Sequence, residues 1–139
     1  MPKKPVSPGK GENMTERPSV LVVDDDQAVR TLLELALSHG GFQVFSAPNG
    51  SSALLQIRIV QPDLVILDIL MPDLDGWGTL QRIREVSTVP ILILTAMEEG
   101  DMVKTCLSRG ADGYLPKPVD MQDLQTRARD LVQGRVARV

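Results

Sequence analysis

The chain has 139 residues and a formal net charge of −3 at pH 7. This length is enough for one domain with a full hydrophobic core, and the slight negative charge gives no broad attraction to nucleic acid or anionic membrane. The single cysteine, Cys106, cannot form a disulfide within the chain, which fits a reducing compartment. No apolar run approaches the roughly 18 residues of a membrane span. We therefore expect a cytoplasmic protein with no direct nucleic-acid binding and no membrane contact.

The first 18 residues, "MPKKPVSPGKGENMTERP", contain lysines but no apolar segment after them. This pattern excludes a secretory signal, and its proline, glycine and lysine content is typical of disorder. The sequence predicts a disordered leader over 1–18, a folded domain over 19–133, and a tail or the start of a linker over 134–139.

Short apolar runs and helical spacings alternate along the folded part of the chain. Continuous or alternating apolar runs predict strands at Val20–Val23, Phe42–Ala47, Leu64–Leu67, Ile91–Leu94 and Gly113–Leu115. A helix is predicted after each strand, and the first of these spans Gln27–His39 and ends at Gly40. The apolar stripes of the other four contain Leu54 and Ile57, then Trp77 and Leu80, then Met102 and Cys106, and finally Leu124 and Ala128.

Strands that alternate with helices predict a parallel sheet covered on both faces, because parallel strands need crossover connections. Right-handed crossovers place the carboxyl ends of all strands at one edge of the sheet. With five strand–helix units the common strand order is 2-1-3-4-5, and ligands bind between the first and third strands, where the order reverses.

Polar residues follow the strands at this edge. Asp24 and Asp25 come directly after the first strand, Asp68 after the third, Thr95 ends the fourth, and Lys117 follows the fifth. Carboxylates that crowd together repel one another, so a compensating charge is needed. A divalent cation that prefers oxygen ligands, most plausibly Mg²⁺, would supply it together with the Lys117 ammonium.

Each of these residues has an ordinary structural role when it is taken alone. An aspartate after a strand is typical of a turn, Thr95 of a helix cap, and Lys117 of a charged surface. Asp26 is expected to cap the following helix rather than to join the site. The functional interpretation depends on the joint placement at neighbouring strand ends, which chance rarely produces.

The chain resembles the receiver domain of bacterial two-component response regulators over about Ser19 to Val132. The resemblance is carried by "VLVVDDD", "PDLVILDILMPDLDG", "VPILILTA" and "GADGYLPKP", in family order and spacing. It implies a flavodoxin-like, doubly wound α/β fold of five strand–helix units. It also implies a signalling switch that is phosphorylated by a sensor histidine kinase or a phosphotransfer protein and assists only its own phosphorylation and dephosphorylation.

The resemblance also implies a role for individual residues. Asp68 is the phosphoacceptor, and Asp24, Asp25 and Asp68 hold Mg²⁺ together with the backbone carbonyl of Leu70. Thr95 and Lys117 bind the phosphoryl group. Thr95 and Tyr114 form the switch that changes the surface of the fourth helix, fifth strand and fifth helix, and the peptide bond between Lys117 and Pro118 is cis.

The partners are less sharply indicated. In the DNA-binding subclass of the family, charges on the fourth helix, fifth strand and fifth helix build a homodimer, and Asp112, Asp123 and Arg127 fit parts of that pattern. Gly113 stands where that subclass usually has a second acidic residue, so the dimer mode stays open. An output domain or a downstream protein is expected to receive the signal.

Two other functions remain as alternatives. A metal-dependent phosphatase of the haloacid dehalogenase type also forms an aspartyl phosphate, but it requires a second aspartate two residues after the nucleophile, where this chain has Leu70. A flavin-binding module would need a serine-, threonine- or glycine-rich phosphate loop after the first strand, and "DDDQA" repels phosphate in the absence of a metal.

Overall fold

The computed structural model describes residues 17–71, 76–97 and 100–134. Five parallel strands form one sheet in the order β2-β1-β3-β4-β5, which confirms the predicted flavodoxin-like fold. The strands are β1 (Ser19–Val23), β2 (Gln43–Ala47), β3 (Leu64–Leu67), β4 (Ile91–Thr95) and β5 (Gly113–Pro116). The helices are α1 (Gln27–His39), α2 (Gly50–Val60), α3 (Gly76–Val86), α4 (Met102–Ser108) and α5 (Met121–Gln133).

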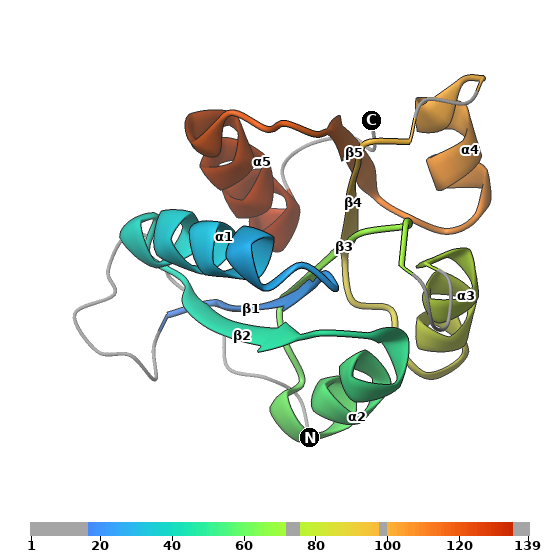
Figure 1. Ribbon diagram of the computed structural model, residues 1–139. Helices are drawn as coiled ribbons and strands as arrows, with labels where there is room; N and C mark the ends of the chain where they lie inside the picture. The colour runs from blue at the N-terminus through green and yellow to red at the C-terminus, as the bar shows by residue number, and fades with distance from the viewer. Residues whose placement is uncertain (1–16, 72–75, 98–99, 135–139) are drawn as a thin grey trace.

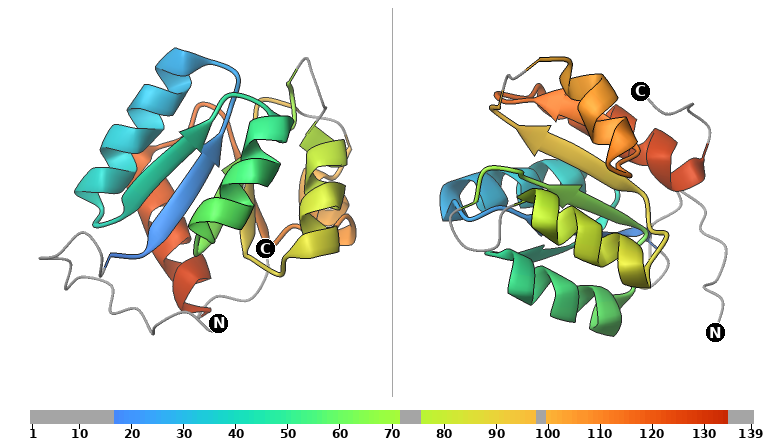
Figure 2. Two further views of the ribbon diagram at one scale, coloured as in Figure 1. Left: turned by 90° about the horizontal axis from the view of Figure 1, so that it is seen from below. Right: turned by 90° about the vertical axis from the view of Figure 1, so that its right-hand side faces the viewer.

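The helices cover both faces of the sheet. Figures 1 and 2 show α1 and α5 on one face and α2, α3 and α4 on the other. The central strands β1, β3 and β4 are buried on both faces, because successive side chains point to opposite sides and helices cover each side. In β1, Leu21 and Val23 join the core beneath α2, α3 and α4, whereas Val20 and Val22 join the core beneath α1 and α5.

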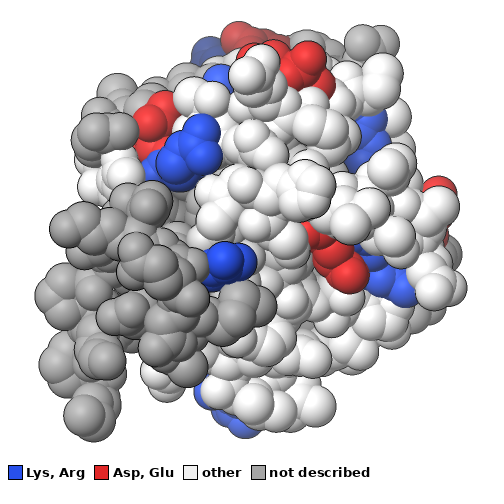
Figure 3. Space-filling model, turned by 90° about the vertical axis from the view of Figure 1, so that its left-hand side faces the viewer, with Lys and Arg blue, Asp and Glu red and all other residues white. Residues whose placement is uncertain are grey.

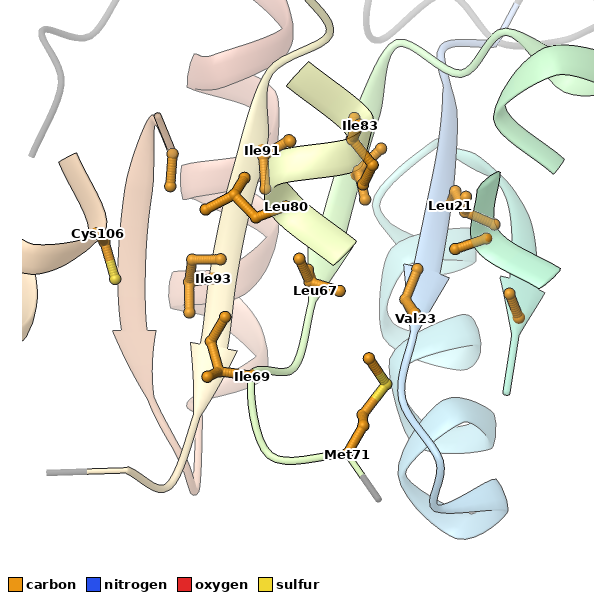
Figure 4. Close-up of a cluster of buried hydrophobic side chains, with 14 of the residues drawn as sticks. Leu21, Val23, Leu67, Ile69, Met71, Leu80, Ile83, Ile91, Ile93 and Cys106 are labelled. Atoms are coloured by element: carbon orange, nitrogen blue, oxygen red, sulfur yellow. The ribbon is translucent and has the colours of Figure 1, made fainter. Parts of the chain in front are cut away.

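The larger core packs the central strands against α2, α3 and α4. Figure 4 shows Leu67 and Ile93 from neighbouring strands beneath Leu80 and Ile83 of α3. Cys106 of α4 joins the same cluster and is fully buried, as its place in the apolar stripe of that helix predicts. This packing makes the sheet a fixed platform for the loops that follow its strands.

Capping explains the bounds of α1. The Asp26 carboxylate accepts hydrogen bonds from the backbone N–H groups of Ala28 and Val29, so its predicted capping role is confirmed.

The strand predicted over Phe42–Ala47 is one residue too long. Phe42 is fully buried, but its N–H donates to the Leu37 carbonyl at 3.0 Å, so Phe42 belongs to the end of the α1 region rather than to β2.

No helix in the described part of the chain is both long and apolar enough to cross a bilayer. On the face in Figure 3, basic and acidic side chains are scattered among uncharged residues without forming one continuous patch. The predicted leader over 1–18 and tail over 134–139 lie almost wholly outside the described residues, and those boundaries stay predictions.

Candidate functional site

The register between β1 and β3 brings their carboxyl ends together. Val23 pairs with Leu67, so the residues that follow, Asp24 and Asp68, leave the sheet side by side. The Asp68 N–H donates to the Val23 carbonyl at 3.0 Å, and the Asp24 N–H donates to the Ala47 carbonyl at 3.2 Å. The backbone of both aspartates is therefore held by the sheet itself.

Three carboxylates converge at this edge, as the sequence predicts. One oxygen from each of Asp24, Asp25 and Asp68 lies within 4.8 Å of the other two. Asp24 and Asp68 are buried, whereas Asp25 is exposed and its carboxylate makes no hydrogen bond to the described residues. Clustered carboxylate oxygens with one member open to solvent fit a hard divalent cation such as Mg²⁺.

Lys117 bridges the two buried carboxylates. Its Nζ donates to Asp24 Oδ2 at 2.7 Å and to Asp68 Oδ2 at 3.1 Å. Burial by itself lowers the pKa of Lys117, but the hydrogen bonds and charges of Asp24 and Asp68 outweigh it and leave that pKa above its ordinary value. Lys117 is therefore charged at neutral pH and offsets part of the repulsion between the carboxylates.

The remaining oxygens of the buried pair bind backbone donors in matching ways. Asp24 Oδ1 accepts from the N–H of Asp26 at 3.0 Å, and Asp68 Oδ1 accepts from the N–H of Leu70 at 3.0 Å. Each buried carboxylate thus has one oxygen on the Lys117 ammonium and the other on an N–H two residues later in the chain. These contacts fix the orientation of both carboxylates toward the shared edge.

Thr95 and Tyr114 lie on the two strands beyond β3. Thr95 is the last residue of β4, is fully buried, and accepts from the Met97 N–H through Oγ1 at 3.3 Å. Tyr114 is opposite Ile93 in the β4–β5 pairing and packs, partly buried, against the core. The Lys117 N–H donates to the Thr95 carbonyl at 3.0 Å, which ties the lysine to the same strand end.

One contact at this edge has no counterpart in the sequence-based prediction. Arg30 Nη1 donates to the backbone carbonyl of Asp24 at 2.8 Å. An arginine in the second turn of a helix is typical of a solvated face, so its spacing from Asp24 gave no signal. The peptide bond between Lys117 and Pro118 is cis, as the family resemblance implies.

Comparisons with known proteins agree with this geometry. The model of the response regulator receiver domain matches residues 20–129. The chain is 43% identical over 122 residues to "Probable transcriptional regulator ycf27" of Pyropia yezoensis, covering 88% of this chain and 49% of that protein. It is 40% identical over 116 residues to "Transcriptional regulatory protein AfsQ1" of Streptomyces coelicolor, covering 84% of this chain and 52% of that protein.

Solved structures give the same result. The Francisella response regulator 1452 receiver domain aligns with a TM-score of 0.79 and 30% identity, covering 86% of this chain and 99% of that chain. The BeF3-activated N-terminal receiver domain of Klebsiella pneumoniae RstA aligns with a TM-score of 0.78 and 30% identity, covering 83% and 98%. Because the family model spans most of the chain and the acidic edge has the expected residues, the chain belongs to the response regulator receiver domain family.

Proposed function

We propose that this protein is a phosphorylation-dependent signalling switch that accepts a phosphoryl group on Asp68. The observation that carries the proposal is the Lys117 ammonium, which binds both Asp24 and Asp68 at an edge that also holds Asp25. A buried carboxylate beside a fixed cation and an acidic pair with one exposed member is suited to receive a charged group and to balance its charge.

The chemistry is an in-line displacement. A carboxylate oxygen of Asp68 forms a bond to the phosphorus, the bond to the donor breaks, and the leaving group departs with its electron pair to give an acyl phosphate. Lys117 pairs with the oxygens of the transferred group. Asp24, Asp25, Asp68 and the Leu70 carbonyl would hold Mg²⁺, which supplies further neutralisation of charge when it is bound.

The signal passes through Thr95 and Tyr114 in this proposal. A phosphoryl group adds charge and strong acceptor oxygens at Asp68, and the Thr95 hydroxyl donates to one of them. The space that Thr95 leaves admits the Tyr114 ring from its partly buried place on β5. The outcome is a two-state surface made of α4, β5 and α5.

Sensor histidine kinases or phosphotransfer proteins are the proposed donors, and the proposed location is the cytoplasm. The chain spans about half the length of the curated relatives it matches, which are named as transcriptional regulators. We propose that the signal goes to an output domain or a downstream protein. We also propose that the protein assists only its own phosphorylation and dephosphorylation and turns over no other substrate.

A homodimer through α4, β5 and α5 is also proposed, but Asp112 is not part of the charge network between its two subunits. Asp112 is buried, and its Oδ2 accepts from Arg84 Nη2 at 2.9 Å and from the Ile91 N–H at 2.9 Å. This carboxylate is therefore engaged within the chain. Asp123 is exposed on α5, and Arg127 of the same helix has one buried guanidinium nitrogen without a hydrogen-bond partner among the described residues.

The test is labelling by a small phosphodonor such as acetyl phosphate, with and without Mg²⁺. We expect the native protein to be labelled only when Mg²⁺ is present, and the Asp68→Asn variant not to be labelled. Asp120→Asn is the matched control, because Asp120 caps α5 and asparagine retains that capping. Labelling of Asp68→Asn at the native rate would contradict the proposal, and sustained release of phosphate from a generic phosphomonoester would favour the phosphatase alternative.

A further inference from the structure

Arg30 joins the first turns of α1 to the loop that carries the acidic pair. Its Nη1 donates to the Asp24 carbonyl at 2.8 Å, and its backbone N–H donates to the Asp26 carbonyl at 3.0 Å. The side chain is partly buried and makes no other hydrogen bond within the described residues. Arg30 thus uses its guanidinium group on the loop backbone rather than on a carboxylate.

The carbonyl that Arg30 holds belongs to the peptide between Asp24 and Asp25. A peptide unit is planar, so a hydrogen bond that holds its carbonyl oxygen also orients the N–H and the α carbon of the next residue. The Asp24 side chain is already held by Lys117 and by the Asp26 N–H. The exposed Asp25 carboxylate makes no such contact with the described residues, so the backbone alone sets its position.

We infer that Arg30 is a positioning residue for the metal site: by holding the Asp24–Asp25 peptide, it keeps the Asp25 carboxylate facing Asp24 and Asp68. The inference rests on the Mg²⁺ site of the proposed function. It extends that site to a residue on α1 that touches no reacting group.

Position and charge predict opposite effects when Arg30 is removed. A guanidinium close to the acidic cluster repels a divalent cation, so its loss strengthens Mg²⁺ binding if electrostatics alone decides. If the guanidinium instead fixes the loop, its loss releases Asp25 and weakens binding, as removal of groups that orient metal ligands does. The sign of the change in Mg²⁺ affinity therefore separates the two roles.

The experiment is calorimetric titration of Mg²⁺ into the metal-free protein at constant ionic strength, for three variants of Arg30. Arg30→Met keeps an unbranched stem but cannot donate, and we expect its Kd to rise about tenfold. Arg30→Ala should behave similarly. Arg30→Lys retains a donor and a charge, and its Kd should lie between those of Arg30→Met and the native protein.

Arg58→Ala is the matched control, because Arg58 is an exposed arginine of α2 and its side chain makes no hydrogen bond within the described residues. Its Kd should equal the native value. Thermal unfolding in EDTA verifies that each variant is folded before metal is added, and if Arg30→Ala unfolds the comparison of Arg30→Met with Arg30→Lys decides.

An unchanged or lower Kd for Arg30→Met, beside a native protein that binds Mg²⁺, overturns the positioning role and leaves the proposed function intact. If the native protein binds no Mg²⁺, both the positioning role of Arg30 and the metal site of the proposed function are overturned. A Kd for Mg²⁺ that rises in Arg30→Met, and rises less in Arg30→Lys, supports the inference. A general loss of packing would not depend on whether the side chain at position 30 can donate a hydrogen bond.

Discussion

The backbone of Gly76 packs directly against the backbone of Ile69. A β carbon on Gly76 would overlap the Ile69 α carbon and lie 2.7 Å from the Asp68 carbonyl oxygen. The Gly76 N–H also donates to the Ile69 carbonyl at 3.0 Å. The first residue of α3 therefore holds the short segment that carries the proposed phosphoacceptor.

Gly76→Ala should destabilise the protein and slow its labelling by a phosphodonor. The added methyl group meets backbone atoms, which cannot move aside without shifting Asp68, and overpacking of this kind costs about 1–3 kcal/mol. Urea denaturation measures the loss. Gly40→Ala is the control, because its β carbon would lie 3.1 Å from the Gln125 side chain and at an ordinary 3.4 Å from the Leu37 carbonyl oxygen. Equal stability of Gly76→Ala and the native protein would contradict this account of the contact.

Mg²⁺ should raise the thermal unfolding midpoint of the native protein. A ligand that binds only the folded state at ten times its Kd adds about 1.4 kcal/mol, which corresponds to roughly 4–6 °C for a domain of this size. Asp25→Ala should remove most of the shift and abolish phosphorylation, because the exposed ligand is lost. A scan with and without millimolar Mg²⁺ measures the effect. The absence of a shift in the native protein, with labelling that needs no metal, would refute the metal site.

Phosphorylated protein should lose its phosphoryl group slowly. In the family, the side chains two residues after the phosphoacceptor and two after the switch threonine flank the approach of water, and here they are Leu70 and Met97. Neither aligns a water strongly, because leucine has no polar atom and a thioether is a weak acceptor. Leu70→Asn with Met97→Glu should speed hydrolysis by roughly one to two decades, since each ~1.4 kcal/mol is tenfold in rate.

Decay of the phosphoprotein after removal of the donor measures this lifetime. Leu70 is 49% exposed and therefore accepts a polar replacement, whereas Met97 packs, partly buried, against the core. Native decay within seconds, or a double variant that decays no faster, would show that these two side chains do not control the entry of water.

The sequence predicts the sheet order and the acidic edge because both follow from patterns along the chain. The alternation of strands and helices predicts the parallel sheet. The pairing of β1 with β3 then brings Asp24 and Asp68 together through the backbone alone, independently of their side-chain contacts. The Arg30 contact and the packing of Gly76 on Ile69 depend on how loops fold back in three dimensions, which has no linear signature. The same is true of Phe42, whose alternation with polar residues looks like a strand although its N–H completes the end of α1.

The Cys106 thiol should resist modification in the native protein. It is fully buried, and burial raises its pKa from 9.0 to about 11. An aromatic disulfide reagent at pH 8 should react slowly with the folded protein and rapidly after denaturation. Rapid reaction of the folded protein would show that α4 opens and exposes this side chain.

The same pKa shift predicts a pH dependence of stability. The folded protein keeps the thiol proton up to about pH 11, whereas the unfolded chain loses it near pH 9.0. The unfolded state therefore binds fewer protons in this range, and the contribution of Cys106 to stability falls as the pH rises from 9 toward 11. Cys106→Ala should lack this part of the decline, and parallel stability curves for the two proteins would contradict the assignment.

The central claim is that Asp68 is the residue that receives the phosphoryl group. Borohydride reduces an acyl phosphate to the alcohol, so phosphorylated protein treated in this way carries homoserine at the modified aspartate, and peptide mass spectrometry locates it. The account predicts homoserine at position 68, only after exposure to phosphodonor with Mg²⁺, and at neither Asp24 nor Asp25. Homoserine at another aspartate, or none in protein that is demonstrably labelled, would contradict it.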